Sequence, residues 1–128
     1  MVLSKVAIFI SLFIVFAIYS IVVYTKGTYK YISYSFTEQE QINKGKEIFQ
    51  KNNCISCHQL YGLGGYLGPE LTTAWSDKHR GEAYMKAFLM AGGSRMPNYN
   101  FNENEINSLL SYLRYVDSTA ITYKVQEP

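Results

Sequence analysis

The chain opens with one continuous apolar stretch, and apolar and polar residues form a repeating pattern only after it. Residues 6–24 carry no charged side chain, and about 20 mostly apolar residues are enough to cross a hydrocarbon core of about 30 Å. A cleaved signal peptide would have a shorter apolar region and a cleavage site of small residues. The residues at the end of this stretch are bulky instead: Ile18, Tyr19, Ile21, Val22 and Val23. The pattern therefore predicts an uncleaved membrane-spanning helix.

Helical periodicity begins near residue 37, where Thr37-x-x-Glu40 matches a capping box at a helix N-terminus. Apolar and small residues then recur at steps of three and four as far as Asn52-Asn53, which we expect to end the helix. Gly45 lies inside this stretch, although a glycine within a helix costs about 0.8–1 kcal/mol relative to alanine. We therefore expect Gly45 to let a second helix approach closely.

Two further helices are predicted in the second half of the chain. One covers residues 80–91 and ends at Gly92 or Gly93 in a left-handed conformation. Its inward-facing residues are predicted to be Tyr84, Met85, Ala87, Phe88 and Ala91. The other begins at an Asn102-x-x-Glu105 capping box. Its apolar stripe, expected to pack on the first helix, is Ile106, Leu109, Leu110 and Leu113.

These patterns predict an all-α protein in three parts. Residues 1–36 form a transmembrane anchor and juxtamembrane segment, residues 37–116 form a domain of three to four helices, and residues 117–128 form a polar tail. The anchor segment holds three lysines and no acidic residue, which leaves nine of the twelve basic residues and all ten acidic ones for the remainder. The remainder is therefore near neutral and has no basic patch, which argues against nucleic-acid binding.

Candidate chemistry lies in Cys54-Ile55-Ser56-Cys57-His58, which matches the C-x-x-C-H pattern for covalent attachment of a c-type haem. Two thiols on one turn can form thioether bonds to one porphyrin, and His58 can then supply an axial nitrogen to the iron. The alternatives are a redox dithiol or a zinc site. Zinc would need two more ligands, but the chain has no other cysteine and one other histidine, His79. Haem c is attached outside an energy-transducing membrane, so the motif predicts a cytoplasmic N-terminus and an exported domain.

The second axial ligand is expected downstream of the motif, where the candidates are Met85, Met90, Met96 and His79. Met96 precedes Pro97 and follows a pair of glycines, so it lies on a rigid non-helical loop that can hold a sulfur over a haem face. Met85 and Met90 fall in a helical pattern, where methionine commonly fills core space. His79 lies among charged residues at a helix start. We predict Met96, and a methionine opposite a histidine raises the reduction potential.

Three other residues are predicted to surround the haem. Pro69 follows a glycine in a G-P-x-L segment, and its carbonyl can accept the free ring N–H of His58 and fix the plane of the imidazole. Trp75, the single tryptophan, is expected to form part of the pocket wall. Arg95 can bind a haem propionate as a bidentate donor. The alternative for these residues is an ordinary surface or packing position.

The order of these features resembles a class I cytochrome c domain over residues 37–116. The N-terminal anchor, the loop from Leu60 to Leu71 and the Arg95-Met96-Pro97-Asn98-Tyr99 segment are similar to the small cytochrome c subunit of respiratory nitric oxide reductase. The resemblance implies an all-α fold around one haem c. The axial ligands would be His58 and Met96, and the thioether sites would be the two cysteines, Cys54 and Cys57.

The resemblance also implies a location and a set of partners. The chain would be a single-pass, non-catalytic subunit of the inner membrane in a denitrifying respiratory chain, with its haem domain on the periplasmic side. Electrons would pass from a soluble cytochrome c or cupredoxin through haem c to a polytopic haem b-containing catalytic subunit, the other half of a heterodimer, which reduces NO to N2O. In relatives the loop matching Gly64 and Tyr66 lies at the subunit boundary near a bound calcium, which implies a calcium site there. This chain departs from the family at Gly65, where alanine is usual.

Two other functions stay open on the sequence. A membrane-anchored cytochrome c could deliver electrons to a haem-copper oxygen reductase, with the anchor raising its effective concentration. Alternatively, the chain could have a structural or assembly role in which the haem only stabilises the fold. A freely swinging tether is disfavoured, because residues 25–36 contain no proline and no serine run.

Overall fold

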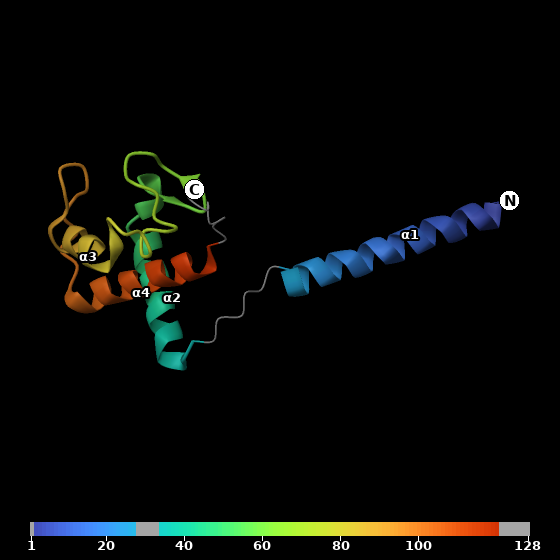
Figure 1. The fold of residues 1–128 in the computed structure, drawn as a ribbon, viewed down its shortest axis with the longest axis horizontal. Helices are drawn as coiled ribbons and strands as arrows, with labels where there is room; N and C mark the ends of the chain where they lie inside the picture. The colour runs from blue at the N-terminus through green and yellow to red at the C-terminus, as the bar shows by residue number, and fades with distance from the viewer. Residues whose placement is uncertain (1, 28–33, 121–128) are drawn as a thin grey trace, which may run out of the picture. The chain divides into compact units, whose positions relative to one another are not determined.

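The computed structural model describes residues 2–27 and 34–120 and divides the chain into two compact units, residues 1–33 and 34–128. Figure 1 shows the four α-helices, α1 to α4, and two very short strands lie between α2 and α3. The predominantly helical fold is confirmed. The predicted anchor residues 28–33 and the tail residues 121–128 lie outside the described residues.

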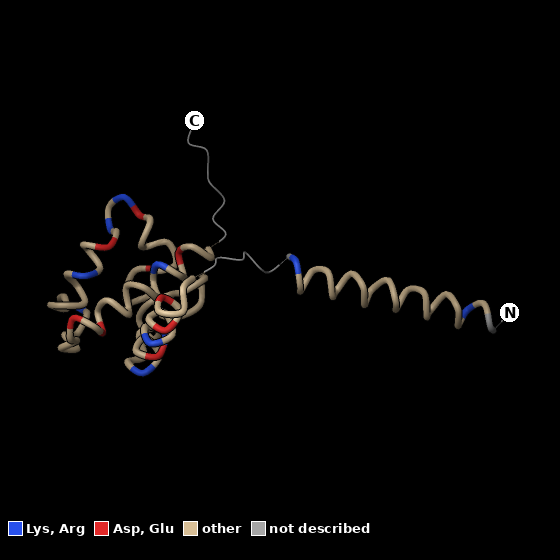
Figure 2. The backbone as a smooth tube through the Cα atoms, turned by 90° about the horizontal axis from the view of Figure 1, so that it is seen from below, with Lys and Arg blue, Asp and Glu red and all other residues tan. Residues whose placement is uncertain are grey.

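The first unit is one long helix, α1 (Val2–Val22), followed by a π-helical turn, η1 (Val23–Gly27). The most apolar 18-residue window of the segment Ser4–Lys26 has a mean hydropathy of 2.9, and none of that window is buried within the protein. Charged residues occur only near the two ends of the described helix, at Lys5 and Lys26 (Figure 2). The predicted apolar helix is confirmed, and it is long and apolar enough to cross a membrane.

The second unit begins with α2 (Phe36–Lys51), which is capped by Ser35 and not by Thr37. The Ser35 hydroxyl accepts a hydrogen bond from the Glu38 amide at 3.3 Å, and the Glu38 carboxylate accepts one from the Ser35 amide at 3.0 Å. The predicted Thr37-x-x-Glu40 box is therefore wrong. The reason is that Ser35-x-x-Glu38 satisfies the same capping rule one half-turn earlier. The predicted end is confirmed, because Asn52 is the C-cap.

The last helix, α4 (Glu103–Thr119), crosses α2 and forms most of the core with it (Figure 1). The predicted Asn102 and Glu105 capping box is present. The helix runs past residue 116, after which the sequence predicts a tail. Its extra turn is held by Asp117, whose carboxylate accepts hydrogen bonds from the Ser76 amide and hydroxyl at 2.8 and 2.9 Å.

Gly45 lies where α2 meets α4, as the sequence predicts. A Cβ built on Gly45 would overlap the carbonyl oxygen of Ser108 and lie 2.6 Å from the Ser108 carbonyl carbon. Glycine is therefore required by the close approach of the two helix backbones. The buried core that surrounds this crossing comprises Phe49, Leu60, Ala74, Met85, Ile106, Leu109, Leu110, Leu113 and Val116.

The third helix, α3 (Gly81–Ala91), is shorter by one residue than predicted, because Arg80 is its N-cap. It ends at Gly92, whose φ of 72° is positive but whose ψ of −160° differs from the predicted left-handed helical value. Met85 is buried, whereas Ala87 and Ala91 are exposed and not inward-facing. Only a single turn of the helix, near Met85, reaches the core, so the predicted inward stripe was too wide.

The segment between α2 and α3 contains little regular structure. A 3-10 turn, η2 (Cys54–Ser56), leads into two paired antiparallel strands, β1 (Gln59–Leu60) and β2 (Leu63–Gly64). Four glycines among residues 59–71 disfavour a regular helix there, and the structure has no helix between η2 and α3. The small hairpin was not predicted, because two-residue strands leave no periodic signal.

Candidate functional site

A cavity in the second unit brings the C-x-x-C-H motif together with segments from the rest of the domain. Its walls come from the motif, the loop between the motif and helix α3, helix α3 itself, the loop between α3 and α4, and one residue of α4. The lining residues that bear on the chemistry are Cys54, Cys57, His58, Pro69, Arg80, Met85, Arg95, Met96 and Tyr99. Most of the other lining residues are apolar, including Leu67, Leu71, Leu89 and Leu113.

The motif is wound into one tight turn immediately after α2. Asn53 adopts a left-handed conformation with φ of 50°, and η2 follows. The Cys57 and His58 amides both donate to the Cys54 carbonyl, at 3.2 and 3.0 Å. This turn places both cysteines and the histidine on the cavity wall. Burial raises the pKa of the Cys54 thiol above its ordinary value, so this thiol is protonated at neutral pH.

The imidazole of His58 is held by the loop that faces it. Its Nδ1 lies 2.8 Å from the Pro69 carbonyl oxygen. A Cβ added at Gly68 would lie 2.6 Å from the same Nδ1, so the backbone runs directly against the ring. Because a carbonyl can only accept, Nδ1 is the donor in this contact, and in the neutral imidazole Nε2 then has the lone pair that can bind a metal ion.

The glycines after the motif pack against its backbone. The Gly65 amide donates to the Ile55 carbonyl at 2.9 Å, and the Gly68 amide donates to the Cys57 carbonyl at 2.8 Å. A Cβ at Gly65 would overlap the Ser56 carbonyl oxygen and lie 2.6 Å from its carbon. This contact is the physical reason for the glycine at residue 65 of this chain. These glycines therefore let the loop backbone run directly against the backbone and the histidine of the motif.

Gly65→Ala is expected to lower the fraction of chains that acquire covalent haem and to reduce the free energy of unfolding by about 1–3 kcal/mol, because the added methyl meets fixed backbone. Haem staining of denaturing gels and thermal melts measure the two effects. Gly62→Ala is the control, because its Cβ would meet nothing within 4 Å and only the strain of its φ of 75° remains. Equal haem content in the Gly65 and Gly62 variants would disprove this reading of the contact.

Of the four candidates for a second axial ligand, the cavity includes Met96 and Met85. The structure places Met90 and His79 elsewhere, both exposed. Met85 is 6% exposed and belongs to the hydrophobic core. Met96 lies on the loop after Gly92, where the Gly93 amide donates to its carbonyl at 2.8 Å. Met96 is thus the thioether on a non-helical wall of the cavity.

Trp75 does not line the cavity, which corrects the expectation for this residue. It packs partly buried against the hydrophobic core, and the guanidinium of Arg114 lies over its ring at 5.8 Å. Ala74 lines the cavity, whereas the side chain of the next residue, Trp75, meets α4 instead. Its sequence position gave no sign of this, because residues 72–79 follow no regular pattern.

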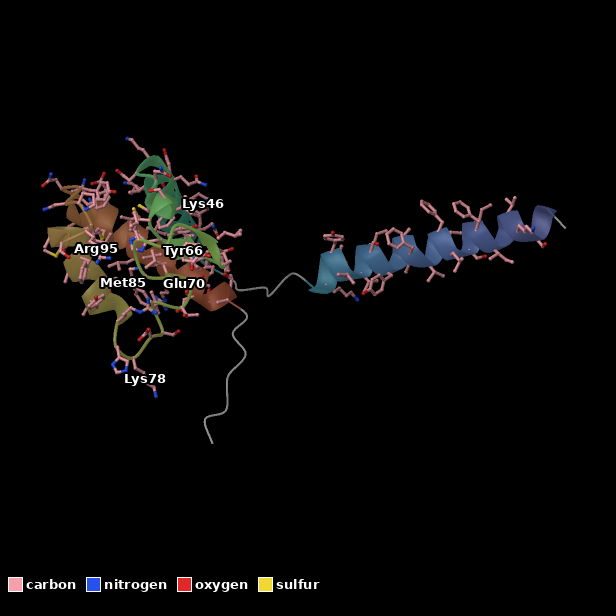
Figure 3. All side chains as sticks on the ribbon, turned by 90° about the horizontal axis from the view of Figure 1, so that it is seen from above. Lys46, Tyr66, Glu70, Lys78, Met85 and Arg95 are labelled. Atoms are coloured by element: carbon pink, nitrogen blue, oxygen red, sulfur yellow. The ribbon has the colours of Figure 1, made fainter. Side chains whose placement is uncertain are left out.

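The remaining predicted residues are spread around the site. Arg95 lines the cavity from an exposed position, whereas Gly64 and Tyr66 do not line it. The Tyr66 side chain is 87% exposed (Figure 3). Among residues 2–27 and 34–120, no three His, Cys, Asp or Glu side chains gather in a way that could hold a metal ion.

Arg80 and Tyr99 are two lining residues that the sequence did not single out. Arg80 stands in a run of charged residues, which is usually a solvated surface. Tyr99 stacks on Phe101 with ring centroids 5.3 Å apart, and burial raises the pKa of its hydroxyl. Its only signal was its place three residues after Met96.

The chain is similar to a cytochrome c family and to subunits of known reductases. The family model described as cytochrome c oxidase, cbb3-type, subunit III matches residues 40–113. The C subunit of nitric oxide reductase from Halomonas halodenitrificans is 33% identical over 90 residues, which cover 61% of this chain and 60% of that protein. Its counterpart from Stutzerimonas stutzeri is 34% identical over 86 residues, covering 59% and 58%. The predicted resemblance to this component of nitric oxide reductase is confirmed.

A more distant similarity involves an oxygen-reducing system. Cytochrome c oxidase subunit 2 of Alkalihalophilus pseudofirmus is 27% identical over 84 residues, which cover 56% of this chain and 25% of that protein. The matched region spans about three fifths of the length of the nitric oxide reductase relatives. The family match covers more than half of the chain and includes the motif, the histidine-facing loop and Met96. The chain therefore belongs to the cytochrome c family described as cytochrome c oxidase, cbb3-type, subunit III.

Proposed function

We propose that the chain is the membrane-anchored monohaem cytochrome c subunit of a nitric oxide reductase. It accepts electrons from a soluble cytochrome c or cupredoxin and passes them to a haem b-containing catalytic subunit that reduces NO to N2O. The observation that carries the proposal is a single cavity lined by both motif cysteines, a histidine held by a carbonyl, and a loop methionine. The similarity to the C subunits of two nitric oxide reductases supports the choice of complex.

The donor set of the cavity fits a haem c. Cys54 and Cys57 would form the two thioethers, and His58 would bind the iron through Nε2. Met96 would supply the sulfur on the other side. The apolar leucines of the wall would exclude water from the ring. When bound, the haem supplies a one-electron redox centre. The Pro69 carbonyl keeps the His58 tautomer and ring plane fixed, so that little rearrangement accompanies a change of charge.

The proposal places the helix α1 in the inner membrane with the N-terminus in the cytoplasm and the haem domain in the periplasm. Lysines lie on both sides of the span, Lys5 on one and Lys26 on the other, so charge alone does not select this orientation. The support is chemical, because covalent haem attachment takes place outside the membrane. The catalytic subunit would be polytopic and would form a heterodimer with this chain. From the same resemblance we also propose a calcium ion at the subunit interface, bound near the loop that holds Gly64 and Tyr66.

We expect the purified complex that carries this chain to consume NO anaerobically when a reduced soluble cytochrome c is the donor. A complex with Cys54→Ser and Cys57→Ser should lose most of this turnover, because electrons no longer enter through a bound haem. The rate is measured with an NO electrode and normalised to the catalytic subunit. NO turnover that survives in the double variant would contradict an electron-entry role.

The second candidate function is electron delivery to an oxygen reductase, which the similarity to a cytochrome c oxidase subunit 2 favours. The same preparation distinguishes the two. Brisk oxygen uptake without NO turnover would make an oxygen reductase the partner. A third reading, in which the haem only stabilises the fold, predicts that both rates are insensitive to the loss of the haem.

A further inference from the structure

The cavity wall carries two guanidinium groups, those of Arg80 and Arg95. None of the lining residues is acidic. A haem c carries two propionate carboxylates, and charges at the edge of an apolar cavity are stable only when they are hydrated or paired. We propose that Arg80, rather than Arg95, is the arginine that binds a haem propionate. This inference rests on the proposed function, because it needs a haem in the cavity.

Arg80 is already held in position by its protein partners. Its Nε and Nη2 lie 2.7 Å from the same oxygen of Asp77, Oδ2, and its Nη1 donates to the Glu70 carbonyl at 2.7 Å. The other carboxylate oxygen of Asp77 accepts from the His79 amide at 2.8 Å. Hydrogen bonds from His79 and Arg80 lower the pKa of the Asp77 carboxyl, so Asp77 stays ionised. The guanidinium is therefore fixed before any ligand arrives.

Two N–H groups of the Arg80 guanidinium are available to bind a carboxylate. A guanidinium has five N–H donors, and the three contacts above leave one N–H on Nη1 and one on Nη2. Two terminal N–H groups of one arginine bind both oxygens of a carboxylate in parallel. The Arg80 side chain is only 25% exposed, so water screens such a pair incompletely. Arg95 lies on an exposed loop and would lose more side-chain freedom on binding.

Arg80 also touches the support of the axial histidine. The Glu70 carbonyl that accepts from Arg80 belongs to the residue after Pro69, whose carbonyl faces His58 Nδ1 at 2.8 Å. A propionate bound by Arg80 is thereby connected to the loop that fixes the imidazole. Arg80 therefore contacts the backbone directly after the carbonyl that faces His58.

The charge assignment predicts opposite effects of two neighbouring substitutions on the reduction potential. Arg80→Gln removes a positive charge that favours the reduced haem, so it should lower the equilibrium constant for reduction about tenfold, or about 59 mV for one electron. Asp77→Asn removes the negative charge beside Arg80 and should raise the potential, while its amide oxygen can still accept from His79. A purely structural role of the pair would expose the haem and shift both variants in the same direction.

The experiment is a redox titration of the full-length protein with covalently bound haem, compared across four variants. Lys78→Gln is the matched control, because Lys78 lies exposed at the outer tip of the same loop and does not line the cavity (Figure 3). Arg95→Gln tests the competing arginine. We expect a lower potential in Arg80→Gln, a higher one in Asp77→Asn, and smaller changes in Arg95→Gln and Lys78→Gln.

Three results would overturn the inference. These are an unchanged potential in Arg80→Gln, a larger shift in Arg95→Gln, or shifts of the same sign in Arg80→Gln and Asp77→Asn. If Arg80→Gln fails to retain haem, Arg80→Lys replaces it. We then expect a smaller fall in the reduction potential, because lysine keeps the positive charge but lacks the paired N–H donors of a guanidinium. A wild-type chain without covalent haem would refute the proposed function itself, whereas normal haem content with unchanged potentials would refute only the role of Arg80.

Discussion

Met96→Ala is expected to lower the reduction potential of the haem by more than about 59 mV, a tenfold change in the reduction equilibrium, and to slow electron entry. A methionine sulfur opposite a histidine stabilises the reduced iron, and Met96 supplies the thioether on a non-helical wall of the cavity. The domain should still fold, because Met96 lies outside the buried core. Redox titration and near-infrared magnetic circular dichroism measure the potential and the loss of sulfur ligation.

Two other methionines make this test specific. Met90→Ala is the control, because Met90 is 57% exposed and does not line the cavity. The reduction potential of the haem in this variant should match that of the wild type. Met85 lines the cavity from α3. An unchanged potential in Met96→Ala together with a loss of sulfur ligation in Met85→Ala would transfer the axial role to Met85 and contradict our assignment.

Gly45→Val should destabilise the domain by about 1–3 kcal/mol or more, as expected for overpacking, and Gly45→Ala should do so to a smaller extent. The sign of the change in unfolding free energy in Gly45→Ala is informative. In an unobstructed helix, alanine would be more stable than glycine by about 0.8–1 kcal/mol. Here the new methyl would overlap the Ser108 carbonyl and meet the Tyr112 Cβ at 2.8 Å, so α2 and α4 must move apart. Chemical denaturation of the second unit measures the change.

The control for Gly45 is its neighbour on the exposed side of α2, Lys46 (Figure 3). Lys46→Ala should change the free energy of unfolding by no more than about 0.5 kcal/mol, as surface substitutions usually do. A Gly45→Ala variant that is more stable than the wild type would show that the helices do not need the glycine. The predicted helix crossing would then be wrong.

The sequence predicted those features that depend on short-range rules. Apolar periodicity indicated three helices of the second unit, and the Asn102 capping box marked the start of α4 correctly. The cost of a glycine within a helix identified Gly45 as a crossing point. The start of α2 was misplaced because two overlapping capping boxes exist, and only the backbone of Ser35, extended at ψ of 158°, distinguishes them.

The features that could not be predicted from the sequence depend on contacts between distant segments. The loop from residue 72 to residue 80 has no period, so nothing showed that Trp75 would turn toward Arg114 while Arg80 reached the cavity. The tight packing of Gly65 on Ser56 is likewise a contact between backbones, and glycine alone does not say which backbone it approaches. In contrast, spacing within one turn is enough to bring together Cys54, Cys57 and His58.

In the proposed function, the electrons that reduce NO pass through the haem of this chain. The direct measurement is to mix the fully reduced, anaerobic complex with NO in a stopped-flow instrument and follow the absorbance of haem c. We expect haem c to become oxidised at least as fast as the complex turns over, and more slowly when oxygen replaces NO. A haem c that stays reduced while NO is consumed would contradict this electron route.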